Sequence, residues 1–316
     1  MNPNTVYVKK NQDMQFCFQY DYKQTWHHSF NIYGVRPAYV YVKNFADSRN
    51  IHHADVSVAL LRFLLNVSFA TKSQIFEYLN LLNISTEEAE PLLERFLESR
   101  VLNAFILSRY PLDHIPEDAL LFYCLDFGGK HLLSHYGQAD LVEWTSVKAI
   151  RGVEYISKYL ITNQFYLTVL KSVQKDLVYF DSFVNFNIGK KDMQVSAAFQ
   201  IKNGHTKRDF VLEVIRDYDL PLAFQRKAEK IDALLNHKYI RKYYQLDPVF
   251  LLLTDNDKAA LECGEIYYRN TNSDQFRLLT LARIAEGFND ESFLKFNPES
   301  NTITSVKSAL FCRDDE

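Results

Sequence analysis

The segment that most constrains the fold of this chain runs from residue 209 to residue 255. Its first part, DFVLEVIR, predicts a buried strand that carries one glutamate, Glu213, and a short acidic turn follows it. The next part, LAFQRKAEKIDALLNHKYIRKYY, has the period of an amphipathic helix. The apolar face of this helix consists of Phe224, Ala228, Ile231 and Leu235. The last part, PVFLLLTD, is too apolar for an exposed strand and predicts a central, buried one.

The flanking sequence extends this segment into an α/β domain over residues 148–290. VEYISKYLITNQFYLTVLKS predicts a helix, and LVYFDSFVNFNI and MQVSAAFQI predict two strands joined through GKKD. After PVFLLLTD, NDKAALECGEIYYRN predicts another helix and FRLLTLARI predicts a final strand. The order helix, three strands, helix, strand resembles the core of the PD-(D/E)XK nucleases.

The resemblance to PD-(D/E)XK nucleases implies a metal-dependent site, which this sequence matches only in part. In that core, an acidic residue of the second strand and the glutamate of an E-x-K motif on the third hold a divalent ion such as magnesium, which activates water. Glu213 stands at the glutamate position, but Ile215 stands where the lysine belongs. Residues 195–197, Val-Ser-Ala, occupy the place of the aspartate.

Two residues are candidates to replace the missing catalytic groups, Asp192 for the aspartate and Arg216 for the lysine. Each lies at a spacing that changes the face of its strand. Metal sites tolerate the loss of ligands poorly, so we predict a degenerate nuclease-like domain without metal, in which magnesium is needed only if the domain cleaves DNA. Glu213 is then expected to pair with a cation of the following helix. That helix offers Arg226, Lys227 and Lys230.

The helix after Glu213 and the residues that follow it carry an excess of positive charge. The cations are Arg226, Lys227, Lys230, Lys238, Arg241 and Lys242. Glu229 and Asp232 are the acidic residues among them. On one face, such cations supply phosphate contacts even in a chain whose formal net charge is −3. The alternative interpretation is a solvated helix face without a ligand.

The first half of the sequence predicts a β-rich arm over residues 1–50 and a winged-helix domain over residues 51–140. The second range contains three helical segments, DVSVALLRFLLN, TKSQIFEYLNLL and STEEAEPLLERFLESRV, and then the strand-like runs VLNAFILSRY and ALLFYCLDF. Thr71 is the expected cap of the second helix, and Ser85 and Glu88 have the spacing of a capping box.

The complete prediction is a mixed fold of class α+β/α/β. The arm, the winged helix and the degenerate nuclease-like domain follow one another, with a boundary near residues 138–148, and residues 291–316 form a C-terminal tail.

The third helix of the predicted winged helix is acidic, which sets it apart from helices that read DNA. Its acidic residues are Glu87, Glu88, Glu90, Glu94 and Glu98, and its only cations are Arg95 and Arg100. Phosphates would repel such a face. Either another surface, such as the hairpin that follows, contacts DNA, or this winged helix binds a protein. The charge of the third helix favours contact with a protein.

Metal ligands and membrane segments are not evident in the sequence. The four cysteines lie far apart, and the pairs His27/His28 and His52/His53 lack further ligands at metal-binding spacing. No stretch approaches the roughly 18 apolar residues that cross a membrane, and the N-terminus lacks the pattern of a signal peptide. We expect a cytoplasmic protein that does not bind a membrane.

Several segments together resemble the replication-relaxation family. They are the winged helix, FYCLDFGGKHLLSHYG, FVLEVIRDYD, the basic helix with Lys230, and PVFLLLTD, and they span residues 55–270. The resemblance implies that Glu213 corresponds to the family's carboxylate on the third strand and Lys230 to its basic position on the following helix. Proteins of this family occur on plasmids and integrated mobile elements of Gram-positive bacteria and are thought to act in plasmid DNA relaxation or replication.

Three functions remain open at this point. The first is a non-catalytic DNA-binding accessory protein in plasmid or mobile-element replication or relaxation. The second is an interaction adaptor whose acidic winged helix recruits a relaxase or a replication protein. The third is a divalent-metal-dependent nuclease that uses Glu213 together with Asp192.

Overall fold

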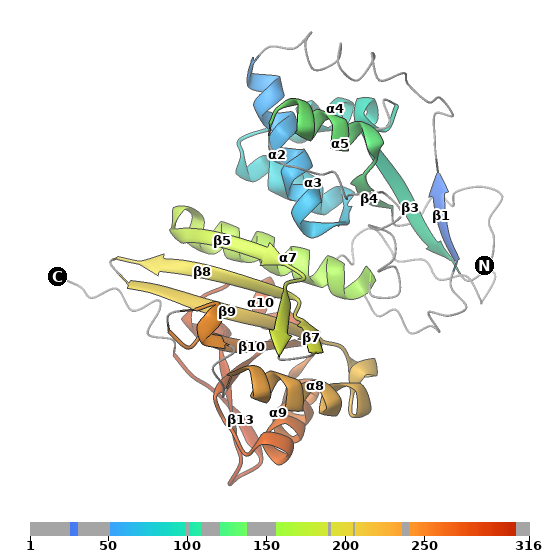
Figure 1. The fold of residues 1–316 in the computed structure, drawn as a ribbon. Coiled ribbons are helices and arrows are strands. Elements are labelled where there is room, and N and C mark those ends of the chain that lie inside the picture. Colours follow the sequence, from blue (N-terminus) through green and yellow to red (C-terminus); the bar gives the residue numbers. More distant parts are fainter. Residues whose placement is uncertain are drawn as a thin grey trace. The chain divides into compact units, whose positions relative to one another are not determined.

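Figure 1 shows the computed structural model of the 316-residue chain. The structure describes residues 26–30, 51–98, 101–108, 121–137, 156–188, 191–204, 206–235, 240–244 and 246–307. The chain forms two compact units, residues 1–163 and 164–316, and the division falls inside helix α7 (Ile156–Val173). Both units combine helices with sheet, so the prediction of a mixed fold is confirmed.

Among its described residues, the first unit contains three helices followed by two strands, in the order that the sequence predicts, together with two further strands and one further helix. Its helices are α2 (Ile51–Val67), α3 (Lys72–Leu81), α4 (Thr86–Glu98) and α5 (Phe127–His135). Its strands are β1 (Trp26–Phe30), β2 (Ala70–Thr71), β3 (Leu102–Ser108) and β4 (Phe122–Leu125). The strands form one sheet in the order β1-β3-β4-β2.

The expected N-terminal arm contributes one described strand to this sheet. β1 pairs antiparallel with β3, from the partners Trp26 and Ser108 to Phe30 and Ala104. The other residues of the arm, and the boundary expected near residues 138–148, lie outside the described residues.

Local capping explains where α3 and α4 begin. Thr71 Oγ1 accepts a hydrogen bond from the Gln74 amide at 3.2 Å, and Gln74 Oε1 accepts one from the Thr71 amide at 3.2 Å. Ser85 and Glu88 form the same reciprocal pair, at 3.3 and 3.2 Å. Both predicted caps are confirmed. α4 continues through Pro91 as a single helix.

The second unit alternates strands and helices after α7. Its strands are β5 (Leu177–Ser182), β6 (Asn185–Ile188), β7 (Lys191–Gln194), β8 (Ala197–Asn203), β9 (Thr206–Ile215), β10 (Val249–Thr254), β11 (Phe276–Thr280), β12 (Leu294–Asn297) and β13 (Thr302–Ser305). Its further α-helices are α8 (Leu222–Leu235), α9 (Asp257–Thr271) and α10 (Leu281–Ala285). Short 3₁₀ helices are η3 (Gln174–Asp176), η4 (Asp217–Asp219), η5 (Ile240–Lys242) and η6 (Asp290–Ser292).

One seven-stranded mixed sheet organises this unit, in the order β13-β12-β11-β10-β9-β8-β5. β9, β10 and β11 run parallel to one another, whereas the other neighbouring strands are antiparallel. β10 lies between β9 and β11 in the interior of the sheet, so the prediction of a central strand for PVFLLLTD is confirmed.

The two faces of the sheet have different cores. Phe199 stacks on Phe180 and on Phe210, with ring centroids 5.4 and 4.8 Å apart, and Phe165 of α7 packs on this ladder. The next residue of β9, Val211, points to the opposite face, which α8 and α9 cover (Figure 1). The buried residues of α8 are Phe224, Ala228, Ile231 and Leu234, the last in place of the expected Leu235.

Four segments differ from the prediction. The expected strands LVYFDSFVNFNI and MQVSAAFQI are each divided, and β6 and β7 form a separate ribbon. Phe183, at the first division, has a φ of 54°, which a strand does not adopt. FRLLTLARI forms β11 and then α10. The expected C-terminal tail contains β12 and β13, because Leu294 and Phe296 alternate along β12 and bury against the sheet.

Candidate nucleic-acid interface

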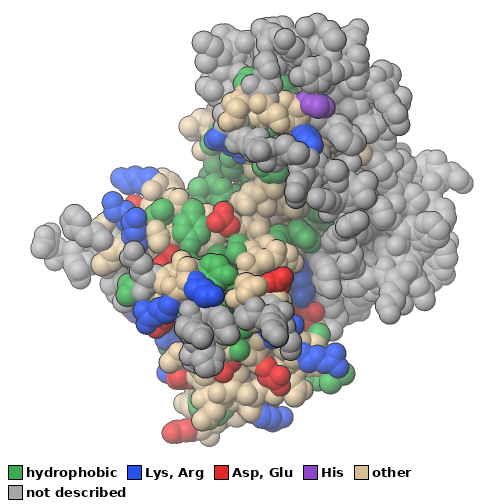
Figure 2. All heavy atoms as spheres, viewed as in Figure 1, with side chains coloured by type: hydrophobic (Ala, Val, Ile, Leu, Met, Phe, Trp, Pro, Cys, Tyr) green, Lys and Arg blue, Asp and Glu red, His purple; other side chains and the backbone are tan. Residues whose placement is uncertain are grey.

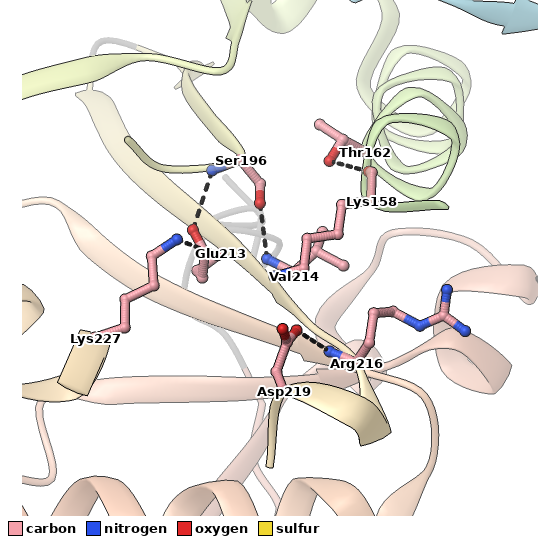
Figure 3. Close-up of polar contacts among 8 residues, drawn as sticks. All are labelled: Lys158, Thr162, Ser196, Glu213, Val214, Arg216, Asp219 and Lys227. Carbon is pink, nitrogen blue, oxygen red and sulfur yellow. Dashed lines mark hydrogen bonds and ion pairs between the residues drawn. The ribbon is translucent and has the colours of Figure 1, made fainter. Parts of the chain in front are cut away.

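Glu213 lies in β9 with its carboxylate inside the protein. The residue is 1% exposed, and its Oε1 forms an ion pair with Lys227 Nζ of α8 at 2.5 Å. Its Oε2 accepts a hydrogen bond from the Ser196 amide at 3.2 Å (Figure 3). Because both carboxylate oxygens have partners, the charge of Glu213 is neutralised within the fold. Of the three cations that the sequence offers to Glu213, the structure selects Lys227.

Alternation along β9 places Glu213 among apolar residues. Val211 and Ile215 share its face and belong to the core that α8 covers. Glu213 is also paired in register with Leu252 of β10. The Lys227 side chain is 28% exposed, so its aliphatic stem reaches inward from the edge of the helix. The pair therefore fixes α8 on the sheet.

Ser196 occupies the region where a nuclease core would have an aspartate. Its amide donates to Glu213, and its Oγ accepts a hydrogen bond from the Val214 amide at 3.0 Å. These bonds join β9 to the residue just before β8, where the chain passes from the β6–β7 ribbon into the main sheet. The sequence indicated Ser196 only as a departure from the nuclease pattern, and its structural contribution was missed.

Arg216, the candidate replacement for the lysine, is engaged elsewhere. It is 2% exposed, and its Nε lies 2.6 Å from Asp255 Oδ1. Figure 3 shows its guanidinium extending away from Glu213. Asp255 Oδ2 also accepts a hydrogen bond from the Asp217 amide at 2.9 Å. Burial raises the pKa of Asp255 above its usual range, and the nearby Arg216 opposes that rise.

Asp192, the candidate replacement for the aspartate, is not brought together with Glu213. It lies in the β6–β7 ribbon, whereas Glu213 lies in the seven-stranded sheet. Its Oδ1 accepts a hydrogen bond from Asn187 Nδ2 at 3.2 Å, on the exposed side of the ribbon. The part of the chain that the structure describes contains no group of three or more His, Cys, Asp or Glu residues placed to hold a metal ion.

The predicted cations of the basic helix divide into several environments. Lys227 points inward to Glu213, whereas Arg226 and Lys230 are exposed and lie one turn apart on the same side of α8. Neither Arg226 nor Lys230 forms an ion pair with another described residue. Glu229 is exposed beside them.

The cations that follow α8 do not extend the exposed pair Arg226 and Lys230 into one patch. Arg241 forms an exposed ion pair with Asp247 at 3.2 Å, and Lys242 is exposed in η5. Lys238 lies outside the described residues. The six predicted cations are therefore not one continuous patch of unpaired charge.

The tyrosines that follow η5 connect this segment to β5 of the main sheet and to β6 of the ribbon. Tyr244 is 8% exposed and hydrogen-bonds Tyr179, whose hydroxyl donates to Asp209 Oδ1 at 3.3 Å. Gln200 Nε2 also donates to Asp209 Oδ1, at 2.7 Å. Burial, and then the charge of Asp209, raise the pKa of Tyr179 to about 12. Tyr243 is 44% exposed, and its hydroxyl accepts a hydrogen bond from the Asn187 amide at 3.1 Å.

Comparison with known proteins gives no match, whether the chain is set against protein-family models, curated proteins or solved structures. The resemblance to the replication-relaxation family therefore stays a prediction. Within the described residues, no helix has both the length and the apolar character needed to cross a membrane.

Proposed function

We propose that this protein binds DNA without cleaving it, as an accessory protein in the replication or relaxation of a plasmid or mobile element. The observation that carries this proposal is the division of cations on α8. Lys227 neutralises the buried Glu213, while Arg226 and Lys230 face solvent. Glu213, which the sequence places at the position of a nuclease carboxylate, thus stabilises the fold, and Arg226 and Lys230 are available to contact phosphates.

The order of elements in each unit supports the proposal. In the first unit, α2, β2, α3, α4, β3 and β4 follow one another as in a winged helix. In the second, α7 precedes β5, β8 and β9, which are neighbours in the sheet, and α8 leads to β10 beside β9. This is the order that the sequence predicts for a nuclease-like core.

The surroundings of the candidate catalytic residues support binding without cleavage. Glu213 has both oxygens engaged, Ile215 occupies the position of the lysine, and Arg216 is paired with Asp255. If a nuclease does operate here, Glu213→Ala should abolish cleavage. Cleavage that is unchanged in this variant would exclude Glu213 from any catalytic role.

A second candidate function is that of an interaction adaptor that recruits a relaxase or replication protein. It rests on α4, where Glu87, Glu88, Glu90 and Glu94 are exposed. One of them, Glu90, forms an ion pair with Lys72. Capture of a relaxase or replication protein from a host that carries the element, lost after reversal of Glu87, Glu88 and Glu94 to Lys, would support the adaptor.

Fluorescence anisotropy with labelled duplex DNA, measured across a salt series, tests the leading proposal. We expect binding that weakens steeply with salt, because each phosphate contact contributes about 0.9 to the slope of log affinity against log salt. The double variant Arg226→Glu/Lys230→Glu should bind more weakly. Lys258→Glu/Arg269→Glu, which changes the same charge on α9, is the matched control.

Two results of this experiment would contradict the proposal. The absence of binding by the unaltered protein even at low salt would remove DNA binding and leave the adaptor. Cleavage products on a denaturing gel, after magnesium is added to the same mixtures of protein and labelled DNA, would replace the non-catalytic function with a nuclease.

A further inference from the structure

The hairpin between β8 and β9 ends in an arrangement of like charges. Lys202 of β8 and Lys207 of β9 are directly opposite each other in the antiparallel register, and both are exposed. Arg208 follows and is also exposed. Gly204, with a φ of 57°, occupies the turn between the strands. Because partners directly across a sheet lie side by side on one face, the two ammonium groups repel each other.

No described acidic residue forms an ion pair with these three cations. The neighbouring acid on β9, Asp209, accepts hydrogen bonds from Tyr179 and Gln200 instead. The fold therefore leaves this positive charge to the solvent or to a ligand.

The end of α7 adds cations beside the hairpin. η3 follows α7 directly and lies against β8, and Leu177, the first residue after η3, is paired with Ile201. Lys171 and Lys175 are exposed in this segment, and Asp176 is its acidic residue. Figure 2 shows Lys and Arg side chains gathered at the left of this unit, where β8 ends and β9 begins.

We infer that this hairpin surface, made of Lys171, Lys175, Lys202, Lys207 and Arg208, binds the phosphate backbone of duplex DNA. The inference rests on the proposed function and assigns the main phosphate contacts to a surface other than α8. Arg208 and Lys207 are successive residues of β9, so they point to opposite faces of the hairpin. Cations on both faces of one projecting hairpin can reach phosphates on both sides of a groove. Because such contacts read charge, we expect affinity with little dependence on DNA sequence.

Three variants of the full chain separate this surface from α8. The hairpin variant is Lys202→Gln/Lys207→Gln/Arg208→Gln, and the α8 variant is Arg226→Gln/Lys230→Gln. The control, Lys258→Gln/Arg269→Gln/Lys295→Gln, changes the net charge by the same amount as the hairpin variant. Each is measured by anisotropy with duplex DNA over a salt series, and its melting temperature is recorded.

We expect the hairpin variant to bind at least about tenfold more weakly and to lose roughly three from the salt slope, about one for each phosphate contact removed. Its melting temperature should be unchanged or higher, because the repulsion between Lys202 and Lys207 is gone. The control should bind like the unaltered protein.

The outcomes distinguish the inference from the proposed function. If the hairpin variant binds normally while the α8 variant loses affinity, the inference is wrong and DNA binding stands. If the control loses as much affinity as the hairpin variant, binding follows net charge alone and the hairpin surface is not a site. If the unaltered protein does not bind DNA at low salt, both are wrong.

Discussion

β9 carries charged residues near both of its ends. The charges near its C-terminal end are buried and paired, whereas those near its N-terminal end are exposed. Toward its end, Glu213 is buried and paired with Lys227, and Arg216 just beyond the strand is paired with Asp255. At its beginning, Lys207 is exposed opposite Lys202, and neither has an ion-pair partner among the described residues. Charge type alone therefore does not reveal what a residue does, because the partner decides it.

The difference has a physical cause. A charge that is taken out of water must be neutralised inside the protein, or the fold loses several kcal/mol. A charge that stays in water needs no partner, so an unmatched cluster persists at small cost. The buried end of β9 thus stabilises the fold, and the exposed end is the part of the strand for which we propose association with DNA.

The strongest test of this comparison removes the cation from the buried pair. Lys227→Met leaves Glu213 buried without its partner, so the free energy of unfolding should fall by about 3–5 kcal/mol. Urea unfolding followed by circular dichroism measures the change. Lys230→Met, at an exposed position of the same helix, should change stability by less than about 0.5 kcal/mol. Equal stability of the two variants would contradict a structural role for the Glu213–Lys227 pair.

The second test examines Arg216 and Asp255 through pH. Arg216→Met should destabilise the protein by about 2–3 kcal/mol at pH 7, since Asp255 keeps its charge in a buried place. Burial already raises the pKa of Asp255, and loss of the opposing cation raises it further. The folded state then binds a proton more readily than the unfolded state, so the deficit should shrink as the pH falls through the raised pKa.

The control for this second test is the double variant Arg216→Met/Asp255→Asn. Without the carboxylate, the deficit measured by urea unfolding should no longer shrink toward acid pH. A deficit in Arg216→Met that stays constant between pH 7 and pH 4 would show that Asp255 does not carry the effect.

The third test lies between the two ends of β9, at Asp209. Tyr179→Phe removes the hydroxyl that donates to Asp209, so we expect a loss of about 1 kcal/mol in the free energy of unfolding. Tyr268→Phe is the control, because the Tyr268 hydroxyl makes no hydrogen bond with the described part of the chain. Chemical denaturation of both variants measures the difference. If Tyr179→Phe leaves the free energy of unfolding unchanged, the hydrogen bonds around Asp209 do not stabilise the fold.

The smallest effect is expected at the exposed end, and it has the opposite sign. Lys207→Gln removes a like-charge pair, so the free energy of unfolding should rise by about 0.2–1 kcal/mol. The gain should diminish in high salt, where exposed charges are screened. Arg226→Gln, which removes an exposed cation without a partner, should leave thermal stability unchanged. A loss of stability in Lys207→Gln would show that this lysine has a structural partner.

The arrangement at the buried end of β9 was partly predictable from the sequence. The apolar run DFVLEVIR and the following helical period indicate that Glu213 faces a helix, and Lys227 is one of the three cations within reach. The pair Arg216 and Asp255 was not predicted, because it depends on the register of two strands. β9 and β10 are parallel with Ile215 opposite Thr254, so the residues that follow each strand become neighbours.

The exposed end was missed for a different reason. A strand is recognised in a sequence by apolar residues that alternate on its buried face. Residues 206–208, TKR, are all exposed and therefore lack this pattern. The sequence therefore predicts a strand that begins at Asp209, whereas β9 begins at Thr206. The extra residues place Lys207 opposite Lys202, a relation that only the pairing of the two strands creates.

The division of the chain inside α7 has a practical consequence for dissecting the protein. In the first unit, Gln74 Nε2 donates to the Leu160 carbonyl at 2.8 Å, and Asn163 Nδ2 donates to the Phe69 carbonyl. In the second, Phe165 packs on the aromatic ladder at Phe199. A cut at residue 140 or 148 would remove from the first unit the half of α7 that packs on it. Separate expression of either unit therefore requires all of α7 in both fragments.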